Sequence, residues 1–208
     1  MPQQPALPRV LIAADVFGVT PELGRFAGAI GAAATLASPH PFNRSFRSEA
    51  EGYASFMASG GVVPYAEHLA GILAGRPFHF DLAIGFSAGA SALWLCLADA
   101  RLEPRLPRRA VLYYGSRIRD HADLEPRRHA RLVFAEREAS FDPCALAAAL
   151  RQRGGRAVVL PGTAHGFMNP RSAGYDEELA TAEAEGIRAL LGFAGARPRR
   201  AFGIPQKT

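Results

Sequence analysis

One short segment of the chain holds a hydroxyl group in a setting suited to nucleophilic attack. The pentapeptide Gly85-Phe86-Ser87-Ala88-Gly89 ends an apolar run, residues 80–86, that predicts a buried strand, and it starts an alanine-rich run, residues 88–100, that predicts a helix. A Gly-x-Ser-x-Gly turn between a strand and a helix is typical of a nucleophile elbow, in which the serine hydroxyl projects above the sheet. The glycines leave room for strand and helix to approach, and the helix N-terminus supplies amide donors for a developing oxyanion.

A base and an acid follow the serine, each after a strand-like run. His165-Gly166 comes after residues 156–160, and two carboxylates, Glu138 and Asp142, come after residues 130–135. Because ligands of parallel sheets bind at the carboxyl ends of the strands, we expect these candidates to gather at that edge. A histidine that takes the serine proton and an acid that orients the histidine are the parts of a nucleophilic catalytic site.

Each of these residues also fits an ordinary structural role. Ser87 can cap the helix that follows it, and Asp142 can cap a helix that starts at Pro143. His165 can be an exposed loop histidine. The strand-turn-helix setting of Ser87 and the position of His165 after the last strand favour the catalytic interpretation. The residues alone leave the choice between Glu138 and Asp142 open.

The other histidines and the cysteines lack such a setting. We expect the histidines at the surface, with His40, near a strand end, as a weak candidate for a pocket; the others are His68, His79, His121 and His129. Cys96 and Cys144 are far apart and match no metal spacing, so we expect two buried thiols rather than a disulfide.

Alternating strands and helices predict the fold. Apolar runs at residues 9–14, 35–38, 80–86, 110–114, 130–135 and 156–160 read as strands. Helices are expected over residues 21–33, 88–100, 143–153 and 172–193, and residues 48–75 carry mixed helical signals, broken at Gly60-Gly61 and Pro64, that suit a small cap over the site. The class is therefore α/β, with a mostly parallel sheet of about six strands and helices on both faces. We expect one domain over residues 1–208, with flexible ends at residues 1–8 and 197–208.

The composition of the chain limits the classes of partner that we expect. The net charge of +5 comes almost wholly from scattered arginines, since Lys207 is the only lysine, and no aromatic-interleaved basic motif appears. We therefore expect no nucleic-acid partner. The apolar run at residues 10–14 is too short for a signal peptide or a membrane span, which favours a cytoplasmic protein with no membrane partner.

Several motifs, in order, resemble the dienelactone hydrolase family of α/β hydrolases over about residues 10–193. The pentapeptide around Ser87 matches the elbow of that family, and the other matching motifs are Asp15-Val16-Phe17-Gly18, Pro39-His40-Pro41-Phe42-Asn43-Arg44, Tyr113-Tyr114-Gly115, Ala164-His165-Gly166-Phe167 and Gly174-Tyr175. The resemblance implies a minimal α/β-hydrolase fold. It places the triad acid at Glu138 rather than Asp142, and it places Asp15 beside Ser87.

The resemblance also implies the rest of the site. The backbone amides of Val16 and Ala88 are expected to form the oxyanion hole. The expected substrate contacts are Asp15, Phe17, Arg44, Tyr114, Phe167 and Asn169. Four positions depart from the best-known members of the family, which carry cysteine at Ser87, aspartate at Glu138, glutamate at Asp15 and, where they bind dienelactone, arginine at Asn169.

Together these features predict a serine hydrolase. The expected substrate is a small carboxylic ester, thioester or lactone, cleaved through an acyl-enzyme by Ser87, His165 and Glu138. No cofactor and no metal is implied. The alternative is a non-catalytic protein of the same fold that binds a small ligand or partner.

Overall fold

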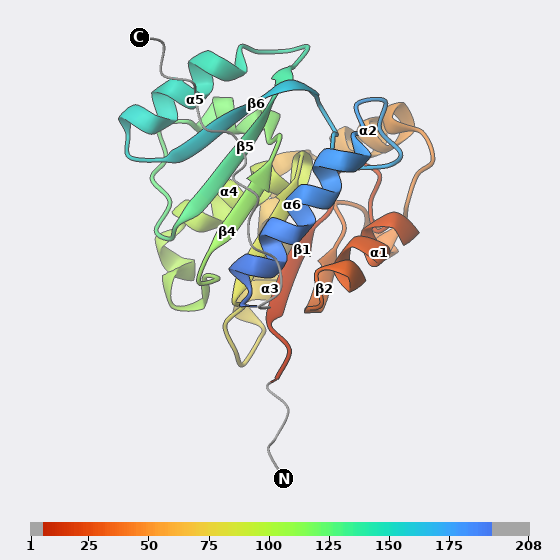
Figure 1. Ribbon diagram of the computed structural model, residues 1–208. Coiled ribbons are helices and arrows are strands. Elements are labelled where there is room, and N and C mark those ends of the chain that lie inside the picture. Colours follow the sequence, from red (N-terminus) through yellow and green to blue (C-terminus); the bar gives the residue numbers. More distant parts are fainter. Residues whose placement is uncertain (1–5, 193–208) are drawn as a thin grey trace.

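The computed structural model describes residues 6–192 of the 208-residue chain (Figure 1). The ends that the sequence predicts to be flexible, residues 1–8 and 197–208, lie outside the described residues except for residues 6–8. The elements, in chain order, are β1 (Arg9–Ala13), α1 (Pro21–Ala29), β2 (Ala33–Ala37), α2 (Glu49–Ala58), α3 (Val62–Ala74), β3 (Leu82–Phe86), α4 (Ala88–Ala98), β4 (Ala110–Tyr113), β5 (Ala130–Arg137), α5 (Pro143–Gln152), β6 (Arg156–Ala164) and α6 (Glu177–Leu190), with short 3₁₀ turns at Pro41–Asn43, Ala100–Arg105 and Ser116–His121.

The strands form one parallel sheet in the order β2-β1-β3-β4-β5-β6. This confirms the predicted α/β class and the sheet of about six strands. The chain runs from β1 outward to β2, then returns to β3 on the other side of β1 and continues to β6. The strand order therefore reverses between β1 and β3, and ligands of such sheets bind outside the carboxyl ends of the strands at that point.

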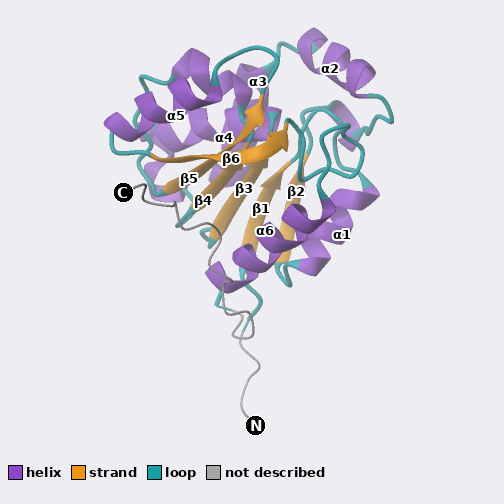
Figure 2. Cartoon of the chain, turned by 45° about the horizontal axis from the view of Figure 1, so that its top comes forward, coloured by secondary structure: helices purple, strands orange, loops and turns teal. Residues whose placement is uncertain are grey.

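Helices cover both faces of the sheet, as predicted (Figures 1 and 2). Strand residues alternate between the two layers. In β1, Leu11 and Ala13 belong to the core layer that also holds residues of α3, α4 and α5, whereas Val10 and Ile12 belong to the layer that holds residues of α1 and α6. No helix between residues 6 and 192 is long and apolar enough to cross a membrane.

A polar network joins α6 to the sheet. The carboxylate of Glu183 on α6 accepts hydrogen bonds from the Tyr113 hydroxyl at 2.8 Å and from both terminal nitrogens of Arg131 at 2.6 and 2.9 Å. The Glu183 side chain is 10% exposed and that of Arg131 is 43% exposed. Because buried carboxylates are costly unless they are paired, this network holds α6 at one place on the sheet.

Some predicted bounds are wrong for local reasons. The helix expected over residues 21–33 ends at Ala29, because Gly31 takes a φ of +70° that a helix cannot continue. Pro64 does not break a helix: it lies in the first turn of α3, where a missing amide proton costs nothing. The last helix begins at Glu177, capped by Asp176, rather than at residue 172.

Two expectations about exposure are also wrong. His40 is 4% exposed and lies in the interior beneath the loop after β1, so it is not a surface residue. Both cysteines are free, as expected, and Cys96 is buried. Cys144 is exposed on α5, so the expectation that both thiols are buried is wrong. Asp142 is the N-cap residue of α5, so Cys144 lies in the first turn of that helix, where its side chain faces solvent.

Candidate active site

Ser87 lies in a sharp turn between β3 and α4. Its backbone has a φ of +48° and a ψ of −108°, a conformation that L-residues rarely adopt. Close packing enforces this turn. A Cβ on Gly85 would lie 2.6 Å from the Cα of Ala90, and one on Gly89 would collide with the carbonyl oxygen of Ala13. Glycine is therefore required on both sides, and the turn exposes the Ser87 side chain at the carboxyl edge of the sheet.

A continuous chain of hydrogen bonds runs from Ser87 to Glu138. The Oγ of Ser87 lies 2.9 Å from Nε2 of His165, and Nδ1 of His165 lies 2.9 and 3.0 Å from the carboxylate oxygens of Glu138. A carboxylate can only accept, so Nδ1 carries the proton and Nε2 is free to accept from the serine hydroxyl. The Glu138 side chain is 3% exposed and that of His165 is 28% exposed, so the acid is shielded and the base faces the site.

Strands β5 and β6 carry the acid and the base to the same point. Their register shifts between Ala135 and Arg137, after which Arg137 pairs with Ala164. The His165 amide then donates to the Arg137 carbonyl at 3.3 Å. This pairing extends the two strands beyond the rest of the sheet. Glu138, which follows Arg137, and His165, which follows Ala164, therefore lie side by side.

Asp142 does not contact His165. Its Oδ1 accepts hydrogen bonds from the amides of Cys144 and Ala145 at 2.8 and 3.1 Å, so it serves as the N-cap of α5. Of the two carboxylates that the sequence leaves in reach, only Glu138 faces the imidazole.

The turn after β6 holds His165 in place. Gly166 has a φ of +82°, and the Ser172 hydroxyl donates to the His165 carbonyl at 3.2 Å. Gly174 packs so closely on that carbonyl that a Cβ would overlap it. The ring of Tyr114 meets the imidazole edge-on with centroids 5.0 Å apart. These contacts explain why α6 starts late: the residues before it support the histidine.

Two backbone amides stand beside Ser87 without partners. Within residues 6–192, neither the Val16 amide nor the Ala88 amide has a protein acceptor. Ala88 is the first residue of α4, where helix amides point outward and the helix dipole favours negative charge. Val16 follows β1 and shares a narrow crevice with Ser87 and His165. Neither amide therefore has a protein acceptor that a ligand oxygen would have to displace.

His40 anchors the loop that carries Val16. Its Nε2 lies 2.8 Å from the Val16 carbonyl oxygen and its Nδ1 lies 3.3 Å from Oγ of Ser55. Because a carbonyl only accepts, Nε2 carries the proton and Nδ1 accepts from the Ser55 hydroxyl. Burial lowers the pKa of His40, which keeps the imidazole neutral in this arrangement. Sequence reasoning missed this role, although the position of His40 just after β2 marks it.

Asp15 is buried at the end of β1. One oxygen accepts from the Phe17 amide at 3.0 Å and the other from the side-chain amide of Asn169 at 2.6 Å. Burial raises the pKa of Asp15 to about 6, and these two hydrogen bonds only partly oppose the rise. Asp15 lines the crevice with Ser87, as expected from the resemblance, but its carboxylate is held by Asn169.

The other expected substrate contacts divide into two groups. Phe17 and Tyr114 line the crevice. Phe167 does not, because it is fully buried in the layer between the sheet and α6. Arg44 is exposed, with its guanidinium 4.6 Å from the centre of the Phe46 ring, and it lines no part of the crevice. Among residues 6–192, no three His, Cys, Asp or Glu side chains are grouped to hold a metal ion.

Comparison with solved structures identifies the fold. A protein assigned as a dienelactone hydrolase from Klebsiella pneumoniae subsp. pneumoniae MGH 78578 superposes with a TM-score of 0.67 at 22% identity, covering 90% of this chain and 87% of that one. A dienelactone hydrolase-like promiscuous phosphotriesterase from metagenomic libraries gives 0.62 at 20% identity, covering 92% and 88%. The fold is that of the dienelactone hydrolase-like α/β hydrolases. This confirms, for the fold, the resemblance that the sequence motifs indicate.

Other comparisons are more distant or shorter. Esterase PE8 shares the α/β-hydrolase fold with a TM-score of 0.53 at 15% identity, covering 89% of this chain and 93% of that one. Uncharacterized protein YczH of Bacillus subtilis (strain 168) is 35% identical over 98 residues. That match spans 46% of each chain, so it covers about half the length of this curated relative. No protein-family model matches the chain.

Proposed function

We propose that this protein is a serine hydrolase that cleaves small carboxylic esters, thioesters or lactones. The observation that carries the proposal is the hydrogen-bond chain from Ser87 through His165 to Glu138, which starts beside the two unpartnered amides of Val16 and Ala88. The esterases and dienelactone hydrolases that share the fold add support.

In the proposed mechanism, Oγ of Ser87 attacks the substrate carbonyl carbon while Nε2 of His165 takes the hydroxyl proton. The oxyanion accepts hydrogen bonds from the amides of Val16 and Ala88. Collapse of the intermediate releases the alcohol or thiol, which takes the proton from His165, and leaves an acyl group on Ser87. Water, deprotonated by His165, then attacks the acyl-enzyme, and the acid leaves as Ser87 recovers its proton. Glu138 keeps the proton of His165 on Nδ1 throughout.

The proposed substrates are uncharged. No arginine or lysine from residues 6–192 lines the crevice. Asn169, at the position where dienelactone-binding relatives carry arginine, is engaged with Asp15. Arg171 is held by Glu22 at 2.8 Å and by the Phe46 carbonyl at 3.0 Å. A substrate carboxylate would therefore meet the Asp15 carboxyl without a guanidinium to pair with, so we infer that neutral esters react better than dienelactone.

Labelling by a fluorophosphonate probe tests the proposal. The probe is expected to label the wild-type chain on Ser87 and to leave Ser87→Ala unlabelled, with turnover of p-nitrophenyl acetate at least about a thousandfold lower in the variant. Ser87→Cys is expected to keep measurable activity toward activated esters, since a thiolate is an intrinsically strong nucleophile. Unlabelled wild-type protein, or an active Ser87→Ala variant, would overturn the mechanism and favour a non-catalytic ligand-binding protein.

A further inference from the structure

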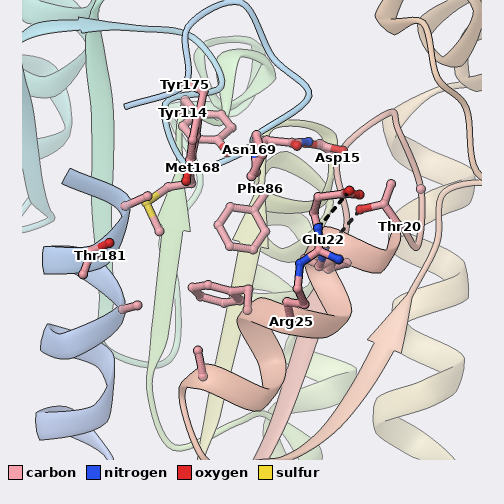
Figure 3. Close-up of a pocket in the computed structure, with 17 residues that line it drawn as sticks. Asp15, Thr20, Glu22, Arg25, Phe86, Tyr114, Met168, Asn169, Tyr175 and Thr181 are labelled. Carbon is pink, nitrogen blue, oxygen red and sulfur yellow. Dashed lines mark hydrogen bonds and ion pairs between the residues drawn. The ribbon is translucent and has the colours of Figure 1, made fainter. Parts of the chain in front are cut away.

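A second cavity lies on the other side of Asp15 from the crevice. It has a volume of about 300 Å³ and sits between α1 and α6, over the end of β3. Figure 3 shows Phe86 between the two helices, with Asn169 and Asp15 lying end to end above it in the view. This volume is at the small end of the range of small-ligand sites. We call this cavity the α1–α6 pocket.

The walls of the α1–α6 pocket are mostly apolar. Leu23 and Phe26 come from α1, Ala180 and Ala184 from α6, and Met168 from the turn after His165. The charged side chains that line it already have partners. Glu22 binds Arg25 at 3.0 Å and Arg171 at 2.8 Å, and the Asp15 carboxyl accepts from the Phe17 and Asn169 amides. An ionic ligand therefore finds no free countercharge at the rim, and an uncharged apolar chain gains the most by entering.

One polar atom in the wall lacks a partner. The side chain of Tyr114 is fully buried, and among residues 6–192 its hydroxyl has no hydrogen-bond partner. The Met168 main chain approaches it and opposes the rise that burial causes in its pKa, but completes no hydrogen bond of normal geometry. A buried hydroxyl without a partner is costly, so a ligand oxygen that accepts from it is favoured.

The pocket and the crevice share a wall. Both Tyr114 and Asp15 line the two cavities, whereas Ser87 and His165 line the crevice alone. A substrate whose carbonyl carbon lies at Ser87 therefore needs to pass only this shared wall to place a hydrocarbon chain between α1 and α6. The wall contains the hydrogen bond between Asp15 and Asn169, two side chains that can separate without disturbing a strand or helix.

We propose that the α1–α6 pocket binds the uncharged apolar chain of the ester substrate, with the Tyr114 hydroxyl donating to an oxygen of that substrate. The inference rests on the proposed function and names its substrate class: esters with a medium-length aliphatic chain on the acyl or the alcohol side. Each methylene that enters the pocket is expected to raise kcat/KM about fourfold, until the pocket is full.

Two ester series test the substrate class. One is the p-nitrophenyl acetate, butyrate, hexanoate and octanoate series, and the other is the acetates of ethanol, butanol, hexanol and octanol. Ala184→Phe fills the pocket from α6, and Ala182→Phe makes the same change at an exposed position of α6 outside it. For each series we take the ratio of kcat/KM for the longest chain to kcat/KM for the shortest chain. In the series whose chain enters the pocket, Ala184→Phe is expected to lower this ratio by at least about tenfold. Ala182→Phe is expected to leave the ratio unchanged.

A second filling variant guards against misfolding. Thr181→Trp acts from an exposed position at the pocket mouth, so it needs no space in the core and is expected to lower the same ratio. The inference is overturned if the wild type has no preference for longer chains in either series, or if Ala184→Phe and Thr181→Trp both keep the wild-type ratio.

Direct binding separates this inference from the proposed chemistry. Octan-2-one is uncharged, carries one acceptor oxygen and cannot be hydrolysed, so calorimetric titration needs no turnover. The Ser87→Ala chain is expected to bind it, and addition of Ala184→Phe is expected to abolish binding. Addition of Tyr114→Phe instead is expected to weaken binding roughly threefold to tenfold through loss of one hydrogen bond. Binding of octan-2-one without any esterase activity would support the α1–α6 pocket as a ligand site and refute the proposed function. Esterase activity without binding of octan-2-one would support the proposed function and refute the role of the pocket.

Discussion

The Oδ2 atom of Asp15 accepts a 2.6 Å hydrogen bond from the side-chain amide of Asn169, 154 residues further along the chain. This contact ties the end of β1 to the turn after β6 and buries a carboxyl group in the wall between the crevice and the α1–α6 pocket. Two neutral donors, the Asn169 and Phe17 amides, do not replace the solvation that the carboxylate loses, so its pKa rises to about 6.

The raised pKa of Asp15 predicts a loss of stability as the pH rises. Between its ordinary value of 3.8 and its folded value of about 6, the folded chain keeps the proton that the unfolded chain releases. The unfolding free energy therefore falls with rising pH through this window and about one pH unit on either side of it, by about 3 kcal/mol in total. Urea denaturation of the wild type and of Asp15→Asn at a series of pH values measures the effect.

The difference between the two curves isolates Asp15. Asparagine does not titrate, so the wild type is expected to lose about 3 kcal/mol relative to Asp15→Asn between pH 3 and pH 7. A hydrogen bond that Asp15→Asn breaks shifts its whole curve but not this slope. Parallel curves would show that Asp15 titrates normally in the folded protein.

The assignment of the acid predicts two unequal variants. Glu138→Gln keeps the shape of the side chain but removes the charge that holds the proton of His165 on Nδ1, so kcat at neutral pH is expected to fall on the order of ten-thousandfold. Asp142→Asn is expected to leave kcat nearly normal, because asparagine caps helices about as well as aspartate. Steady-state kinetics on p-nitrophenyl esters, with circular dichroism to check folding, makes the comparison.

The reverse result would move the acid to Asp142 and would require the loop between β5 and α5 to rearrange. Asp142→Ala provides a further control: it removes the two hydrogen bonds to the amides of Cys144 and Ala145 and is expected to cost about 1 kcal/mol of stability without a matching loss of kcat.

Much of the fold was predictable because its signals are local. The apolar run before Ser87, the glycines that flank it and the Asp-Pro start of α5 each specify structure within a few residues. The order serine, acid, histidine, each after a parallel strand, then brings the three side chains to one edge of the sheet, where Ser87, His165 and Glu138 do form hydrogen bonds. Their catalytic roles stay predictions.

The parts that were missed depend on distant contacts. The burial of His40 comes from Phe46, Ser55 and the Val16 carbonyl, none of which its own sequence neighbourhood reveals. The pairing of Asp15 with Asn169 joins opposite ends of the chain. The late start of α6 was missed for a similar reason: the packing of Gly174 and Ser172 on the His165 carbonyl holds the residues before Asp176 in a turn, and that contact is made with a residue outside the helix.

The network around Glu183 predicts a specific loss of stability. Glu183→Ala leaves the buried Tyr113 hydroxyl and the Arg131 guanidinium without their acceptor. Removing one partner of a fully buried ion pair costs about 3–5 kcal/mol of unfolding free energy. Arg131 is partly solvated, so we expect a smaller loss of about 2–3 kcal/mol. Thermal and urea denaturation measure the loss, and Glu185→Ala, an exposed change on the same helix, is the matched control. Equal stability of the two variants would mean that the network adds nothing to the fold.

His40 is predicted to act as a positioning residue for the oxyanion amide of Val16. It touches no substrate in the proposed mechanism, but its Nε2 proton holds the carbonyl of Val16, the residue whose amide is proposed to bind the oxyanion. Its loss lets that amide drift from the oxyanion, which exists only after Ser87 attacks. His40→Phe is therefore expected to lower kcat roughly tenfold to a hundredfold, less than deletion of a donor, with KM little changed.

The conservative variant separates positioning from packing. His40→Gln can still donate from a side-chain amide to the Val16 carbonyl, so it is expected to recover most of the kcat that His40→Phe loses, even if both are less stable. His129→Gln, at an exposed histidine that makes no side-chain hydrogen bond among residues 6–192, is the matched control and is expected to behave as the wild type. If His40→Gln and His40→Phe lose kcat equally, or if the loss appears in KM alone, His40 supports the fold and does not position the amide. Steady-state kinetics well below the unfolding temperature of each variant keeps the two effects apart.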